Sequence, residues 1–355
     1  MSPRPPLSHD DYTVACICPM SVEQAPVEAL LDEIHPDLPT SRDKNNYTLG
    51  RIHRHNTVIA VLSDPGNSTV ASVATQLLND FRSIRFSLLI GIGGGVPDLD
   101  HDADIRLGDV VVSKPSGTFG GVVQFLRGKL LPEDRFERTG ALQRPPDVLL
   151  ASVARLETLH RRLDSEIPRY LEEMIQKYPK MRQGGYVHQG VENDKLFRAE
   201  FQHVAGNDCK SCNPDEAIER EPRLDLNTVI HYGTIGSSDA VIKDGQVRDK
   251  LRDDLKIQCV ETEAAGLMAS LPCLIIRGIC DYADSHKNNR WQPYAAATAA
   301  AYAKELLSLV TTLDIPQCIQ TTLHLGAVHN FLNEYVSGDV VGGDKFQDLA
   351  VRSIT

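Results

Sequence analysis

The sequence predicts an α/β fold, a three-layer α/β/α sandwich around a mixed, twisted central sheet. Short apolar runs alternate with segments of helical periodicity from the start of the chain, and this alternation resumes after one long interruption. Such alternation is typical of a sheet covered by helices. A chain of 355 residues is also long enough to bury one large core.

The N-terminal half begins with an apolar run at 13–18 (TVACIC), which predicts a buried strand, and VEQAPVEALLDEI after it predicts a helix. Residues 47–54 and 56–63 predict a strand pair joined by a tight turn at His55 and Asn56. A helix is predicted next at 68–81, and two buried strands follow it at 87–94 (SLLIGIGG) and 109–115.

The C-terminal half continues the alternation at 227–236, 256–269 and 273–284, and it ends in a predicted helix at 294–312. Residues 115–225 break this rhythm with a long charged helix-like stretch and a polar, loop-rich segment, which predicts an insertion within one domain spanning 12–313. Residues 1–11 are expected to be a disordered lead-in. Residues 314–355 are expected to be a tail that serves as a linker or an interaction motif.

Composition restricts the class of protein. The formal net charge of −11 argues against a general nucleic-acid binder, which needs a basic face. An apolar run of about 18 residues is missing, so no membrane span is expected, and the polar, Pro-rich N-terminus is not a secretory signal. Cysteines inside apolar runs are typical of a reducing compartment, which predicts a cytoplasmic protein.

Cys209 and Cys212 have the spacing of a metal-binding or redox pair. A structural zinc site needs four ligands, and no second cysteine pair follows at finger spacing. His203 and His231 are near in sequence, which leaves a Cys2His2 site as the alternative. Because the second cysteine pair is missing, we expect neither a metal nor a cofactor.

The glycine run LLIGIGGGVPD (88–98) follows a predicted strand. It is not a Walker A loop, because no Gly-Lys-Ser/Thr follows. It also lacks the helix that a dinucleotide-binding fingerprint requires, since Pro97 and Asp98 begin a turn-forming acidic loop. The remaining interpretation is that Gly93 and Gly94 let a ligand or another strand approach the backbone closely.

Carboxylates occur where predicted strands end. Asp281 follows a buried strand, and desolvation there would suit it to donating a proton. Only one of Glu261 and Glu263 is expected to point into a cleft; alternatively, both are acids stabilised at a helix N-terminus. Glu23 lies in the first turn of the helix after the first strand. Ligands bind at the carboxyl ends of strands in open α/β sheets, which favours a site here.

The ordered blocks GIGGGV, IRLGDVVVS, YGTIGSSDAVI, VETEAAGL and RGICDYAD resemble the nucleoside phosphorylase and nucleosidase superfamily over residues 12–312. The likeness is greatest to a fungal branch found at the N-terminus of NLR-like proteins. It implies that Asp281 protonates N7 of a purine, that Glu23 activates water and that Glu263 holds the ribose hydroxyls. Thr262 replaces a sugar-contacting methionine.

The resemblance also implies further substrate contacts and a homo-oligomer. Val241, after Ser238, stands where hydrolytic relatives carry an aromatic residue that stacks on adenine. Trp291 or Tyr294 is expected to close the pocket from the final helix. The reaction implied is cleavage of a purine N-glycosidic bond in adenosine, AMP or ATP.

The nucleophile is either water or phosphate. Phosphorolytic relatives grip phosphate with an arginine on the glycine-run strand. The matching position here is Leu89, which favours hydrolysis and leaves phosphorolysis as the alternative. Gly66 and Ser68 are candidates for holding an anion.

Four basic residues are candidates for binding a 5′-phosphate or triphosphate, as in relatives that resemble ATP nucleosidases, or else form a solvated surface: Arg106, Lys114, Arg127 and Lys129. A second alternative class is a nucleotide-sensing or scaffold domain of an NLR-like immune system that has weak catalytic activity. The three acids Glu23, Glu263 and Asp281 favour an enzyme, because a pure binder would not need all of them.

Overall fold

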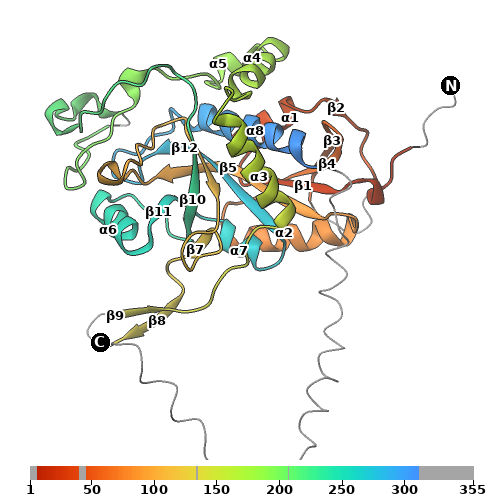
Figure 1. Ribbon diagram of the computed structural model, residues 1–355, viewed down its shortest axis with the longest axis horizontal. Helices are drawn as coiled ribbons and strands as arrows, with labels where there is room; N and C mark the ends of the chain where they lie inside the picture. Colours follow the sequence, from red (N-terminus) through yellow and green to blue (C-terminus); the bar gives the residue numbers. More distant parts are fainter. Residues whose placement is uncertain (1–5, 40–44, 133–134, 207, 312–355) are drawn as a thin grey trace, which may run out of the picture. The chain divides into compact units, whose positions relative to one another are not determined.

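The computed structural model describes residues 6–39, 45–132, 135–206 and 208–311 (Figure 1). Its central sheet has the strand order β11-β10-β6-β12-β5-β1-β4-β3-β2, and β7 pairs with β10. The sheet is mixed, because β1, β4, β5 and β12 run parallel whereas β6 runs antiparallel to β12. The strands are β1 (Val14–Cys18), β2 (Glu33–Ile34), β3 (Tyr47–Ile52), β4 (His55–Val61), β5 (Phe86–Gly95), β6 (Val110–Ser113), β7 (Val122–Gln124), β10 (Ile230–Ser237), β11 (Ile257–Glu261) and β12 (Cys273–Asp281).

Side-chain alternation along the buried strands divides the core between the two faces of the sheet. In β1, Cys16 packs into one apolar cluster and Ile17 into the other. The first cluster is covered by α1, α3, α4 and α8, and the second by α2 and α7. The helices are α1 (Ser21–Ala29), α2 (Asn67–Asp80), α3 (Asp147–His160), α4 (Ile167–Lys177), α5 (Lys180–Gln183), α6 (Gly245–Leu255), α7 (Ala264–Met268) and α8 (Gln292–Leu309).

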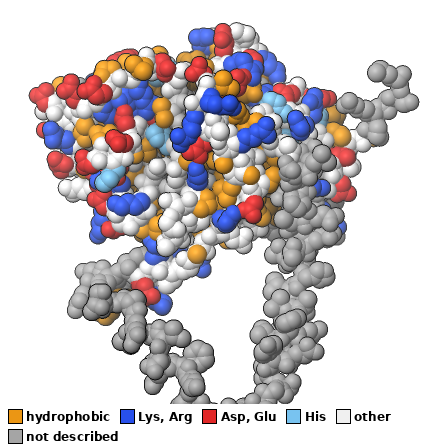
Figure 2. Space-filling view, in the orientation of Figure 1, with side chains coloured by type: hydrophobic (Ala, Val, Ile, Leu, Met, Phe, Trp, Pro, Cys, Tyr) orange, Lys and Arg blue, Asp and Glu red, His pale blue; other side chains and the backbone are white. Residues whose placement is uncertain are grey.

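This arrangement confirms the predicted α/β fold with helices on both faces of a mixed sheet. None of the helices in the described part of the chain is long and apolar enough to cross a membrane. On the face drawn in Figure 2, basic and acidic side chains are interspersed.

Two local predictions were wrong. The turn between β3 and β4 is at His53 and Arg54, where His53 has a φ of 52°, and not at His55 and Asn56, which belong to β4. The charged helix-like stretch, residues 148–167, is not one helix, since α3 ends at His160 and α4 begins at Ile167. The strand predicted at 87–94 is confirmed as β5, and β12 and β11 pair with its glycines from either side.

The segment expected to be an insertion supplies part of the main fold. Within it, β7 joins the central sheet, α3 and α4 pack into the first core cluster, and β8 (Gly128–Leu131) and β9 (Arg135–Arg138) form a separate hairpin. The described residues of 184–229 contain three short 3-10 helices and no α-helix or named strand; these are Val191–Asn193, Cys209–Ser211 and Pro214–Glu216. His9–Asp11 of the expected lead-in is also a 3-10 helix. The expected tail, 314–355, lies outside the described residues.

Gly278 of β12 lets α8 lie directly on the sheet. A Cβ atom there would lie 1.8 Å from the carbonyl oxygen of Ala295. We expect Gly278→Ala to lower the free energy of unfolding by about 2–3 kcal/mol, because a backbone atom of the helix must move. Urea denaturation measures this. The matched control is Gly184→Ala, whose Cβ would meet its nearest neighbour at 3.4 Å; equal stability of the two variants would contradict the packing.

Candidate active site

A cavity of about 230 Å³ lies at the ends of β5, β11 and β12, beside the start of α1. It brings together most of the residues that the sequence singles out for the reaction and the sugar. Its lining includes Glu23, Gly93, Gly94, Val241, Glu261, Thr262, Glu263, Arg277, Asp281, Lys287 and Gln292.

Arg277 of β12 lies at the centre of this group. Its Nη2 donates to Glu261 and to Glu263 Oε2, the latter at 3.0 Å, and its Nη1 lies 3.8 Å from Glu23 Oε1. Only 1% of the side chain is exposed. Burial disfavours the charged guanidinium, but the three glutamates outweigh burial and raise the pKa of Arg277 above its usual value. Arg277 is therefore a fixed cation.

Gly91 makes this position of the guanidinium possible. A Cβ atom at Gly91 would lie 2.4 Å from Arg277 Nη1 and 2.5 Å from Glu23 Oε1. Any side chain on this residue would displace both charged groups. The first glycine of the run thus gives space to the protein's own ion pair.

Glu23 is held by both of its carboxylate oxygens. Met20 N donates to Oε2 at 2.6 Å, and Ile92 N of β5 donates to Oε1 at 2.7 Å. Burial raises the pKa of Glu23 to about 8, against the opposing effect of Arg277. A carboxyl group with this pKa changes protonation state near neutral pH, as an efficient general base must.

Glu261 and Glu263 both line the cavity, so the expectation that only one does so was wrong. Strand β11 ends at Glu261, and Glu263 is the N-cap of α7, so the alternation of side chains along a strand does not separate the two residues. Glu261 also accepts hydrogen bonds from the backbone N–H groups of Glu263 and Ala264, at 3.1 and 2.9 Å, at the start of α7. The Thr262 hydroxyl donates to Glu263, which keeps that carboxylate at the cavity wall.

Asp281 ends β12 with its carboxylate almost fully buried. This burial agrees with the expected desolvation, and the carboxylate also has a cationic partner, because Lys287 Nζ lies 2.8 Å from Asp281 Oδ2. Ala283 N donates to Oδ1 at 2.9 Å, and the Cys280 thiol donates to Oδ2 at 3.0 Å. Burial disfavours the ammonium group, yet the Asp281 carboxylate raises the pKa of Lys287.

The predicted aromatic lid residues lie elsewhere. The Trp291 indole N–H donates to Asn193 O at 3.2 Å, and Tyr294 packs against Gly108 beside a separate hollow. Gln292 lines the cavity in their place. The Ser238 hydroxyl accepts from Ala240 N at 2.9 Å and fixes the loop that leads to the exposed side chain of Val241.

The four basic candidates for phosphate binding do not line the cavity. Lys114 pairs with Glu157 at 2.7 Å, and Arg106 donates to Asp104 and to Glu221 O. Arg127 lines another hollow, and Lys129 is exposed on β8.

The two anion candidates at the start of α2 are also outside the lining, although Pro65 beside them belongs to it. Gly66 caps α2, and Asn67 donates to Asp239 at 3.1 Å from its backbone. Ser68 is exposed in the first turn of that helix. Leu89 is fully buried between Ile17 and Ile275 in the second core cluster. Its identity therefore says nothing about the nucleophile.

The sequence interpretation missed Arg277 and Lys287. A charged residue inside the apolar run CLIIRGIC was a signal, since an unpaired charge in a buried strand is costly. Lys287 gave no comparable signal, because it follows a turn in a polar segment.

Comparisons with known proteins agree on the fold and the family. The family model described as "Phosphorylase superfamily" matches residues 13–313. The solved structure of futalosine hydrolase from Helicobacter pylori has a TM-score of 0.53 and 16% identity, covering 85% of this chain and 99% of its own. The 5′-methylthioadenosine/S-adenosylhomocysteine nucleosidase of the same organism has a TM-score of 0.53 and 15% identity, over 84% and 98% of the two chains.

Two curated relatives are larger proteins. A nucleotide-binding leucine-rich repeat (NLR)-like protein of Hyaloscypha variabilis is 40% identical over 87% of this chain and 30% of its own length. ATP nucleosidase Cap17 of Escherichia coli is 22% identical over 70% of this chain and 41% of its own. The chain thus spans less than half of each relative. By the extent of the family match, it belongs to the phosphorylase superfamily, whose members include nucleoside phosphorylases and nucleosidases.

Proposed function

We propose that this chain hydrolyses the N-glycosidic bond of a purine nucleoside or nucleotide and releases the free base. The observation that carries the proposal is that Glu23, Glu263 and Asp281 line one cavity around Arg277. Glycosidic cleavage passes through an oxocarbenium-like transition state. Such a reaction needs a proton donor for the leaving group and a base for water on the other side of the sugar.

Each acid has a role in this proposal. Asp281 passes a proton from the Lys287 ammonium, which lies 2.8 Å away, to purine N7. The deprotonated form of Glu23 removes a proton from the attacking water. Glu263 accepts hydrogen bonds from the ribose hydroxyls, and Arg277 keeps its carboxylate charged and in place.

Water is favoured over phosphate because of the charges around the cavity. Among the described residues of the lining, the cations Arg277 and Lys287 are both paired with carboxylates. An incoming phosphate would meet Glu23, Glu261 and Glu263 at close range, and like charges in a buried site repel strongly. Water carries no such cost.

The direct test is incubation of the purified chain with adenosine, AMP, ATP and inosine, with and without phosphate. We expect free base to appear without phosphate. Release that requires phosphate would show phosphorolysis instead. Comparing the four substrates identifies the base and the 5′ substituent.

Replacing the acid removes the proton donor. We expect Asp281→Asn to lower kcat by about 100- to 10,000-fold, the usual contribution of a positioned general acid. The matched control is Asp100→Asn, which changes an exposed carboxylate in the acidic loop after β5. Chromatography measures base release by both variants, and full activity of Asp281→Asn would refute the assignment of Asp281 as the general acid.

The buried base predicts a pH profile. Because Glu23 acts when deprotonated and its pKa is about 8, kcat/KM should rise with pH, about tenfold per unit, and level off above about 8. Glu23→Gln should be slow and lose this rise. Glu28→Gln on the same helix, outside the cavity lining, should keep it. A wild-type profile that is flat between pH 6 and about 8 would contradict the role of Glu23.

A second candidate is a nucleotide-sensing or scaffold domain, which the NLR-like relative favours. It predicts that calorimetry detects nucleotide binding while base release is absent or far slower than about 1 s⁻¹, the lower end of typical enzyme rates. Base release at or above this rate from any of the four substrates excludes this candidate.

A further inference from the structure

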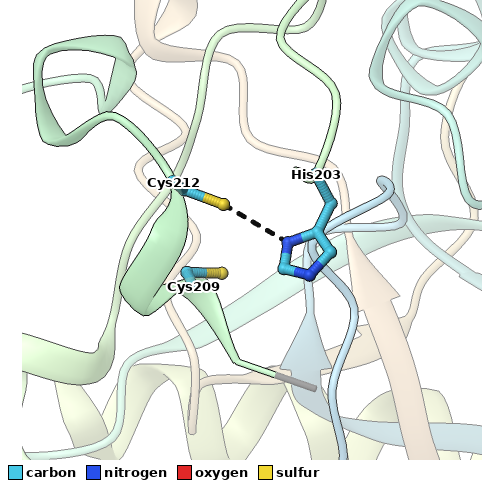
Figure 3. A group of neighbouring side chains, drawn as sticks. All are labelled: His203, Cys209 and Cys212. Atoms are coloured by element: carbon cyan, nitrogen blue, oxygen red, sulfur yellow. Dashed lines mark hydrogen bonds between the residues drawn. The ribbon is translucent and has the colours of Figure 1, made fainter. Parts of the chain in front are cut away.

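A second group of reactive side chains lies in the loop-rich segment between α5 and β10. His203, Cys209 and Cys212 point toward one another, as Figure 3 shows. Their ligand atoms all lie within 4.8 Å of one another, and Cys212 Sγ is 3.3 Å from His203 Nδ1. The candidate active site uses none of them.

Two thiols and an imidazole form a donor set that suits Zn²⁺. Zinc–sulfur and zinc–nitrogen bonds of about 2.3 and 2.0–2.1 Å place tetrahedral ligand atoms about 3.3–3.8 Å apart. The group therefore needs only small side-chain shifts to enclose the ion. Cysteine binds zinc as the thiolate, so zinc binding releases the thiol protons.

His231, the second histidine that the sequence suggested, is bound elsewhere. Its Nε2 lies 2.9 Å from Asp109 Oδ2. His286 is the available replacement, because its ring lies 5.5 Å from that of His203. The ring is buried and stacked on Phe197, and its Nδ1 lies 3.7 Å from Asp284 Oδ1, too far for a hydrogen bond. Among the described residues neither ring nitrogen has a hydrogen-bond partner, so the buried imidazole has a nitrogen available for a ligand.

The location gives such an ion a structural role. Where the structure describes it, the segment 184–229 has no α-helix or named strand. Its backbone is tied to the turn after β12, because His203 N donates to Ser285 Oγ at 2.9 Å. His203, Cys209 and His286 also line a cavity of about 770 Å³ that extends to Asp281 and Lys287. An ion here would fix the wall of that cavity.

We propose that His203, Cys209 and Cys212, with His286 as the fourth ligand, bind a structural Zn²⁺ ion that fastens residues 184–229 beside the end of β12. This differs from the expectation of no metal. The competing state of a Cys-x-x-Cys pair is a disulfide, which has no use for either histidine.

The test uses the full chain, purified under reducing conditions, stripped with a chelator and reloaded with zinc sulfate. We expect elemental mass spectrometry to find about one zinc ion per chain, and the midpoint of thermal unfolding to be higher with zinc than without it. Loading with Co²⁺ in place of zinc should give the absorption band of thiolate-to-metal charge transfer. Cys209→Ser, Cys212→Ser and His203→Ala should each weaken zinc binding by more than about 100-fold, and His286→Ala by at least about tenfold, since even partners of ligands contribute about 10- to 100-fold. Ser211→Ala, between the two cysteines, is the matched control and should bind normally.

A measurement on the unmodified chain covers the case in which a variant does not fold. Zinc should protect Cys209 and Cys212 from alkylation, which peptide mapping measures. Failure of the wild-type chain to take up zinc would overturn the site. So would unchanged affinity in the cysteine variants or a Cys209–Cys212 disulfide in the reduced preparation. Unchanged affinity in His286→Ala would overturn the fourth ligand. None of these results depends on base release, so failure here is distinct from failure of the proposed hydrolysis.

Discussion

The cavity depends on one buried cation. Arg277 bonds to two glutamates of the β11–α7 junction and faces a third on α1, so its guanidinium connects three parts of the chain that are far apart in sequence. Burying an ion pair costs much of what the attraction returns, and removing one partner leaves an uncompensated charge. The carboxylates therefore hold fixed positions because the guanidinium requires them there. This constraint, more than the shape of the cavity, fixes the geometry available to a substrate.

The strands and most helices were predictable because their signals are local. The continuous apolar run of β1 and the apolar spacing of α2 are properties of short segments. The glycine run gave a weaker signal, because glycines carry no side chain and add nothing to a periodic pattern. Gly93 and Gly94 are strand residues only because β12 and β11 pair with them, and those partners lie more than 150 residues away.

The candidate site was predictable in part for a similar reason. Glu23 and Asp281 lie at strand ends, and carboxyl ends of parallel strands converge at one edge of a sheet. Pairing between side chains is not local, so Lys287 beside Asp281 gave no signal. Trp291 and Tyr294 were misplaced because their assignment required the rotation of α8 about its axis. Gln292 faces the cavity, and Tyr294, two residues further along, lies roughly 200° around the helix.

The buried carboxyl of Glu23 also links folding to proton uptake. Its pKa is about 8 in the folded chain, compared with an ordinary value of 4.5. Between these values the folded chain keeps a proton that the unfolded chain has lost, so the free energy of unfolding falls as pH rises across this range. This contribution to stability is complete below the ordinary pKa of 4.5 and is lost as pH rises through the folded-state pKa of about 8. The deprotonation of Glu23 that would activate the base therefore also lowers the free energy of unfolding. A rise in pH would make the chain more reactive and, at the same time, less stable.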